Sequence, residues 1–155
     1  MKYEQPFEVE FIHRTLNLLK QYDSIDDTLK YEHTLFLNLC VGLLIIPQNA
    51  YFNKFKCLET VIITQEEWGI EPNHISFGEK DIHNVIRHIR NSISHKRFEF
   101  ISHGSHNITH IKIWDIKINK DTHKIKPSFN AKFSINEFRN FVINITEYAL
   151  NNFAK

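Results

Sequence analysis

Apolar residues recur every three or four positions in several stretches of the chain, and this spacing predicts helices. The first two helices are expected over about 7–22 and 28–46. Pro47 should end the second helix, because proline lacks a backbone N–H. A third helix is expected within 51–68, and the Gly, Pro and Asn residues that follow predict a loop over 68–78.

The clearest helical pattern lies over 79–94. At about 100° per residue, four isoleucines fall within about 40° of one line. They are Ile82, Ile86, Ile89 and Ile93. A polar stripe about a quarter turn away holds His83, Arg87, Arg90 and Ser94. The last helix is predicted to begin at a capping box, Ser134-Ile135-Asn136-Glu137.

Between these two helices the apolar period changes to two, which predicts strands. Alternation occurs at 98–100, 111–118 and 129–133, with turn signals at His103-Gly104-Ser105 and Asn119-Lys120-Asp121. A change of phase between 113 and 114 suggests a bulge. We therefore expect a mainly α protein, an antiparallel bundle of about five helices with a three-stranded antiparallel β-meander over about 97–133, before the last helix.

A length of 155 residues, with 42% hydrophobic and 24% charged residues, predicts a single globular domain over 1–155. A net charge of +1 argues against a protein that coats long nucleic acid, so contact with RNA should be local. The N-terminal charges argue against a signal peptide, and the longest apolar run, 35–46, is too short to span a membrane. With a buried thiol expected at Cys40 and no disulfide framework, we expect a cytoplasmic protein.

Residues suited to RNA chemistry gather at the end of the 79–94 helix, in Arg90-Asn91-Ser92-Ile93-Ser94-His95. The Arg90 guanidinium is a permanent cation suited to phosphate, and the His95 imidazole exchanges protons near neutral pH. RNA carries its own nucleophile, the 2′-hydroxyl, so this pair could cleave it without a metal or other cofactor. Asn91 could hold the 2′-hydroxyl or the phosphate, and the product would be a 2′,3′-cyclic phosphate.

The same residues also fit an ordinary helix end, because the macrodipole favours arginine and histidine there. On a regular helix Arg90 and His95 point about 140° apart. Either the helix ends near Ser94 and His95 turns back, or a second chain completes the site across a twofold axis. The strand pattern that begins by Arg97 favours a helix end at or near His95.

The chain resembles HEPN domains, a superfamily named for higher eukaryotes and prokaryotes nucleotide-binding. Their motif is an arginine, a polar residue that is often asparagine, and a histidine a few residues later, as in Arg90-Asn91-x3-His95. One bacterial branch is similar in further features: Tyr31-Glu32-x-Thr34-Leu35, Leu37-Asn38, Gly42-Leu43 leading to Pro47, and a β-insertion after the histidine.

The resemblance implies a homodimeric, metal-independent endoribonuclease, a toxin or antiphage defence effector, with Arg90, Asn91 and His95 in catalysis. A cognate antitoxin protein would be a further partner. Arg87, Lys96 and Arg97 are expected to bind RNA, although Lys96 and Arg97 also fit an exposed strand edge. Some members carry a tyrosine that an adenylylating antitoxin modifies; Arg97 stands there, so that form of control is not expected.

Other interpretations stay open from the sequence. The domain could bind a nucleotide or RNA end without cleaving it, or could only pair with a partner protein. His103, His106 and His110 span a predicted turn and could hold zinc, but we expect exposed turn histidines and predict no metal or cofactor. Asn38, alone in an apolar helix, is expected to hydrogen-bond across the core, with a role in the site as the alternative.

Overall fold

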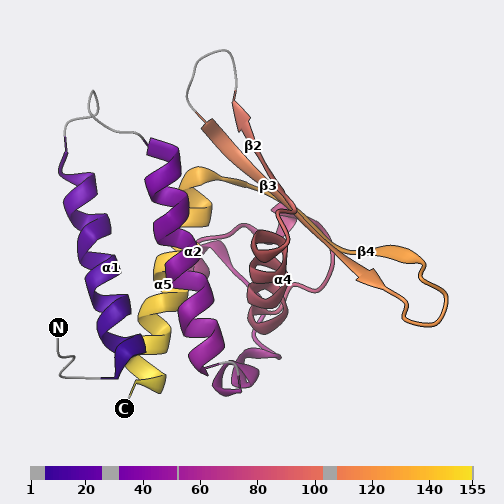
Figure 1. The fold of residues 1–155 in the computed structure, drawn as a ribbon, viewed down its shortest axis with the longest axis horizontal. Coiled ribbons are helices and arrows are strands. Elements are labelled where there is room, and N and C mark those ends of the chain that lie inside the picture. The colour runs from indigo at the N-terminus through magenta and orange to yellow at the C-terminus, as the bar shows by residue number, and fades with distance from the viewer. Residues whose placement is uncertain (1–5, 26–31, 52, 103–107, 155) are drawn as a thin grey trace. The chain divides into compact units, whose positions relative to one another are not determined.

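The computed structural model describes residues 6–25, 32–51, 53–102 and 108–154 (Figure 1). Contacts divide the chain into two compact units, Met1–Lys54 with Val142–Lys155, and Phe55–Phe141. No helix within the described ranges is both long and apolar enough to cross a membrane. The predicted turn at His103-Gly104-Ser105 and the predicted start of the second helix lie outside the described residues.

The first unit contains three helical segments: α1 (Phe7–Asp23), α2 (Glu32–Tyr51) and the second half of α5 (Ile135–Phe153). α1 and α2 pack side by side (Figure 1). Gly42 permits their close approach, because the Phe11 ring lies 3.3 Å from the position that a Cβ would occupy. The Thr146 hydroxyl donates to the Leu43 carbonyl at 3.3 Å, which joins α5 to α2.

Two predictions for α2 are wrong. The helix continues through Pro47 to Tyr51 instead of ending at the proline. Pro47 removes one backbone hydrogen bond, but it is buried along with Leu43 and Leu44, and this apolar packing offsets the loss. Asn38 is exposed, so the expected hydrogen bond across the core is not formed. Cys40, in contrast, is buried as expected.

The single third helix predicted within 51–68 is also wrong. Two short pieces replace it, η2 (Lys54–Leu58) and α3 (Gln65–Trp68). Ile62 forms a β-bridge with Asp81 between the two pieces, which requires extended backbone there. Gly69 ends α3 in the left-handed conformation, with φ 85°, where a Cβ would lie 2.7 Å from Asn140.

The second unit is built on an antiparallel sheet with strand order β1-β4-β3-β2. Its strands are β1 (Ile75–Phe77), β2 (Phe98–Ser102), β3 (Ile108–Ile118) and β4 (Ile125–Ser134). The predicted meander corresponds to β2, β3 and β4, but the sheet has four strands rather than three. β1 lies in the segment predicted to be a loop and pairs with β4, Ile75 opposite Ala131. Three residues are too few to show a period, so this strand left no pattern.

The predicted bulge lies farther along the chain than expected. Ile111, Ile113 and Asp115 are all buried, so the alternation of β3 continues unbroken through 113 and 114. The register shifts between Asp115, opposite Phe129, and Ile116, opposite Pro127, which makes Ser128 the additional residue of the bulge. Because Asp115 is charged but occupies an inward position, the sequence pattern looked like a change of phase.

α4 (Ile82–Ser94) packs against β3, and its four isoleucines are buried as predicted. The helix begins later than expected, because the Asp81 carboxylate caps it by accepting from Asn84 N–H at 2.9 Å. His83 of the predicted polar stripe is buried as well. The capping box before α5 is confirmed: Ser134 N–H donates to Glu137 Oε2 at 2.9 Å, and Glu137 N–H donates to Ser134 Oγ at 3.1 Å.

Candidate functional site

The predicted motif lies at the C-terminal end of α4, and His95 is the capping residue there. Lys96 N–H donates to the Ile93 carbonyl at 3.1 Å, and Arg97 N–H donates to the Ser92 carbonyl at 2.7 Å. Lys96 has φ 53°, so these bonds form a Schellman ending with a lysine at the left-handed position that glycine usually takes. The helix end expected at or near His95 is confirmed.

The structure brings together only two of the three predicted catalytic residues. Arg90 is half-buried, and its Nη1 donates to Asn91 Oδ1 at 3.3 Å. His95 is exposed. Among the described residues, no hydrogen bond or ion pair joins His95 to Arg90 or Asn91. The two arrangements expected from the sequence, in which His95 turns back or a second chain completes the site, both stay predictions.

The residues predicted to bind RNA occupy three different surroundings. Lys96 is exposed. Arg87 is half-buried, and its Nη2 lies 3.5 Å from a Glu79 carboxylate oxygen. Arg97 is directed inward, where its Nη1 donates to Asp115 Oδ1 at 2.7 Å. Arg97 therefore pairs with a buried carboxylate and is not simply an exposed residue at a strand edge.

Asp115 is the centre of a buried polar cluster that joins α4 to β3. Its side chain is 5% exposed and accepts hydrogen bonds from Arg97, from Ile116 N–H at 2.9 Å and from Asn91 Nδ2 at 3.5 Å. Arg97 and Ile116 bond to Oδ1, whereas Oδ2, which accepts from Asn91, also lies 2.9 Å from His88 Nδ1. Burial raises the pKa of Asp115, but hydrogen bonds from His88, Ile116 and Asn91 outweigh it, so the pKa lies below its ordinary value. The carboxylate is therefore ionised at neutral pH.

The His88 ring has a stacking partner on one face and polar partners at both nitrogens. Its side chain is 6% exposed and stacks on Phe129 with centroids 5.0 Å apart and planes 9° apart. Nε2 lies 3.3 Å from Arg87 Nη2. Because arginine has no acceptor, Nε2 accepts this hydrogen bond, and the ring proton is assigned to Nδ1, facing Asp115. In this tautomer the acceptor nitrogen faces Arg87, and it also lies 4.0 Å from Glu79 Oε2.

Backbone and hydroxyl contacts fix the end of α4 to the middle of β3. Ser92 Oγ lies 2.7 Å from both the His88 carbonyl on its own helix and the Trp114 carbonyl on β3. Trp114 N–H donates to the Arg97 carbonyl at 3.1 Å. The motif and the buried cluster are therefore connected through short, direct contacts.

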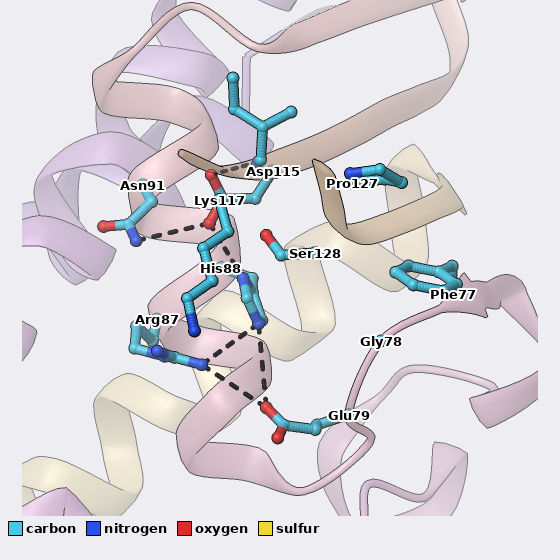
Figure 2. Close-up of a pocket in the computed structure, with 11 residues that line it drawn as sticks. Phe77, Gly78, Glu79, Arg87, His88, Asn91, Asp115, Lys117, Pro127 and Ser128 are labelled. Atoms are coloured by element: carbon cyan, nitrogen blue, oxygen red, sulfur yellow. Dashed lines mark hydrogen bonds and ion pairs between the residues drawn. The ribbon is translucent and has the colours of Figure 1, made fainter. Parts of the chain in front are cut away.

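A pocket of about 600 Å³ opens beside this cluster (Figure 2). Figure 2 shows Arg87, Lys117 and Asn91 along one side and Phe77 with Pro127 across from them. Gly78 forms part of the wall between Phe77 and Glu79. It has φ 114°, and a Cβ there would lie 2.9 Å from the Phe129 ring and 3.0 Å from the Ser128 carbonyl, so only glycine lets this loop lie on the bulge of β4.

Comparison with known proteins identifies the family. The model of a protein family described as HEPN pEK499 p136 matches residues 1–155. The chain belongs to this HEPN family. The resemblance drawn from Arg90-Asn91-x3-His95 is thus confirmed at the level of the superfamily, and the chain is a HEPN-type module. Neither the curated proteins nor the solved structures contain a match.

Sequence reasoning about this HEPN domain missed Asp115 and placed His88 only in a basic cluster around the motif, without its buried contact with Asp115. A signal for Asp115 was present, because it continues the inward positions of Ile111 and Ile113, and a buried carboxylate requires partners. His88 lies beside the predicted polar stripe and had no signal of its own. Phe77 and Lys117, exposed residues at the pocket, had none either.

Two of the three histidines considered as zinc ligands lie outside the described residues. His103 and His106 are not among the described residues, whereas His110 Nδ1 lies 2.9 Å from Thr109 Oγ1. In the part of the chain that is described, no three His, Cys, Asp or Glu side chains are grouped as metal ligands would be.

Proposed function

We propose that this HEPN domain is a metal-independent endoribonuclease whose catalytic residues are Arg90, Asn91 and His95. The observation that carries the proposal is the Schellman ending of α4, which leaves His95 exposed beyond the bonded pair of Arg90 and Asn91. Membership of a HEPN family supports the same assignment. The substrate is RNA, because its own 2′-hydroxyl is the nucleophile, so the catalytic residues need only move a proton and stabilise the phosphate charge.

The reaction that these residues support is a transesterification. His95 accepts the proton of the 2′-hydroxyl as the 2′-oxygen bonds to phosphorus and the P–O5′ bond breaks. The leaving 5′-oxygen takes up a proton from water, and His95 later returns its proton to water. Arg90 donates to the non-bridging oxygens, where negative charge increases in the transition state. Asn91, bonded to Arg90 at 3.3 Å, holds the guanidinium in place. The products are a 2′,3′-cyclic phosphate and a 5′-hydroxyl.

We place the complete site across the twofold axis of a homodimer, with Arg90 of one protomer facing His95 of the other. This arrangement is supported by the absence, among the described residues, of a hydrogen bond between Arg90 and His95 of one protomer. A role as a toxin or antiphage effector, restrained by an antitoxin protein, belongs to the same proposal. Lys96, exposed beside His95, adds a cation for the RNA backbone.

The test compares wild type, Arg90→Ala and His95→Ala on end-labelled RNA in excess EDTA. Loss of an acid–base group should lower the rate by about 10²–10⁴-fold, and loss of the guanidinium by about 10²–10³-fold. His13→Ala and Arg14→Ala, exposed residues of α1, are the matched controls. Thermal unfolding by circular dichroism checks that every variant is folded. Cleavage at the wild-type rate by either motif variant would contradict the proposal.

A second candidate function is a non-catalytic module that binds RNA or a nucleotide. It is favoured by the pocket beside His88 and by the absence of a bond between Arg90 and His95 among the described residues. This module would bind the same RNA and release it intact. Binding without cyclic-phosphate products, across RNA substrates of varied sequence, is the outcome that favours it.

A further inference from the structure

The pocket beside the buried cluster has the features of a binding site for one nucleotide. Its volume of about 600 Å³ is within the range of small-molecule sites. Two of its lining side chains, His88 and Asp115, are more than nine-tenths buried and fixed by contacts on several sides. A site with its polar groups fixed in advance loses little order when a ligand binds.

One side of the pocket is suited to phosphate. Arg87 and Lys117 both line it, and Figure 2 shows them on the same side. Two acids also line the pocket: Asp115, which is engaged by Arg97 and His88, and Glu79, which is 63% exposed and lies 3.5 Å from Arg87. An exposed ion pair of this length contributes little, so a phosphate could replace Glu79 as the partner of the guanidinium.

The other side is suited to a base. The Phe77 side chain is 52% exposed and stands at the pocket across from the cations, with Pro127 near it (Figure 2). An aromatic ring exposed beside bound phosphate is the arrangement by which proteins stack the bases of single-stranded nucleic acid. Gly78 fixes this ring relative to the pocket, because the loop packs directly on Phe129 and Ser128.

His88 supplies an acceptor between the two sides. Its Nε2 has no proton in the assigned tautomer and lies 3.3 Å from Arg87 Nη2. When a phosphate engages Arg87, Nε2 becomes available to a hydroxyl donor. A ribose 2′-hydroxyl is such a donor, and deoxyribose lacks it.

We propose that this pocket binds one ribonucleotide unit of the RNA strand, with its phosphate on Arg87 and Lys117, its base on Phe77 and its 2′-hydroxyl on His88. Asn91 lines the pocket and also bonds to Arg90, so the unit lies next to the motif. The assignment rests on the proposed function for its substrate, yet it concerns binding rather than cleavage.

The test measures dissociation constants by fluorescence anisotropy at one fixed salt concentration. The probe is fluorescein-labelled decauridylate, and the background is His95→Ala, so that the probe stays intact. Arg87→Ala, Lys117→Ala and Phe77→Ala should each weaken binding by about tenfold, whereas Phe77→Tyr should keep the wild-type affinity. Lys56→Ala and Ile62→Ala remove an exposed cation and an exposed apolar side chain elsewhere in the same unit and should change affinity less than about twofold.

Two further comparisons identify the ligand. The deoxyuridylate strand of equal length should bind about tenfold more weakly than the RNA, and His88→Asn should remove most of that difference. The asparagine keeps an N–H near the position of Nδ1, and thermal unfolding checks its fold. Free uridine 5′-monophosphate should displace the probe only at more than about 100 times the concentration of unlabelled decauridylate. Displacement at equal concentration would overturn the assignment to an RNA strand.

The failures of the two proposals are distinguishable. If Lys117→Ala and Phe77→Ala bind the probe as the background does, the pocket is not the subsite, whatever the cleavage assay gives. If these two variants lose affinity while wild type leaves RNA intact, the subsite stands and the endoribonuclease assignment fails.

Discussion

His88 and Asp115 are 27 positions apart in the sequence, yet Nδ1 of the histidine lies 2.9 Å from Oδ2 of the aspartate. Both side chains are almost fully buried. Asp115 also accepts from Arg97 and from Ile116 N–H, so a single carboxylate satisfies donors from α4, β3 and the segment between them. Removing its charge leaves several donors with a weaker partner or none.

Asp115→Ala should therefore lower the free energy of unfolding by about 3–5 kcal/mol, the usual cost of leaving a buried ionic group unpaired. Urea denaturation followed by circular dichroism measures this difference. Asp121→Ala, in the exposed turn after β3, is the matched control and should change stability by less than about 0.5 kcal/mol. Equal effects of the two substitutions would mean that the cluster does not stabilise the fold.

Acid should destabilise the protein partly through the same carboxylate. Burial raises the pKa of Asp115 but its hydrogen bonds lower it more, so the folded pKa lies below the unfolded value of about 3.9. The stabilisation is complete above that value and is lost as pH falls through the folded pKa. We expect urea titrations from pH 7 to pH 2 to show that acid lowers the free energy of unfolding less in Asp115→Asn than in wild type.

The Asp115→Asn variant should still lose some stability at acid pH because of Glu137. Burial raises the pKa of Glu137, but hydrogen bonds from Ser134, and a contact with His74, lower it more. Stabilisation from Glu137 likewise disappears as pH falls. An Asp115→Asn protein whose pH profile coincides with that of wild type would contradict the role given to Asp115.

The capping box should contribute measurably to stability. Ser134→Ala removes one cap of α5 and should cost about 1 kcal/mol. Glu137→Ala should cost more, because Glu137 also lies 2.6 Å from His74 Nδ1 and accepts from Glu71 N–H at 3.3 Å. Asn136→Ala, exposed in the same turn, serves as the control in a thermal unfolding series. The reverse order of the first two costs would be inconsistent with these contacts.

Lys96→Gly should separate the backbone role of this residue from its charge. A left-handed φ of 53° is unfavourable for lysine and suits glycine, so the variant should gain about 0.5–1 kcal/mol of stability. Its affinity for decauridylate should nevertheless decrease, since a cation beside His95 is lost. His123→Gly, at φ 54°, is a matched control that should gain stability with unchanged RNA affinity. Unchanged affinity in Lys96→Gly would exclude the lysine from RNA binding.

Mixing Arg90→Ala with His95→Ala protein should restore cleavage if the site is shared between protomers. Each mixed dimer then contains one complete pair, and random exchange should give about a quarter of the wild-type rate. Sedimentation checks that dimers form and exchange. A mixture as inactive as its two components would place Arg90 and His95 in the same protomer.

Sequence patterning was most informative where one local rule decides the structure. The isoleucine stripe of α4 and the capping box of α5 each follow from side chains within a few positions, and both are confirmed. Likewise, the switch from helix to strand period located the end of α4 correctly.

Features that depend on contacts between distant parts of the chain were harder to predict from the sequence. The packing that carries α2 through Pro47 involves residues with no marker of their own, and β1 exists because β4 is there to pair with it. Asp115 gives a misleading sequence pattern for a physical reason, since a buried carboxylate is unfavourable without partners, and its partners Arg97 and His88 are distant in the sequence. For the candidate site, the motif could be predicted from the sequence, whereas the contacts that hold His88 against Asp115 could not.

The Ser92 hydroxyl has a consequence for motion. Because it lies between the His88 and Trp114 carbonyls, α4 cannot fray from its C-terminal end without also releasing the centre of β3. Amide protons on both elements should then exchange with deuterium as one cooperative group. Their exchange should be slower than that of the amides in the turn between β3 and β4. The end of a helix is usually its most labile part, and here Ser92 anchors it together with the Schellman bonds and the Asp115 cluster.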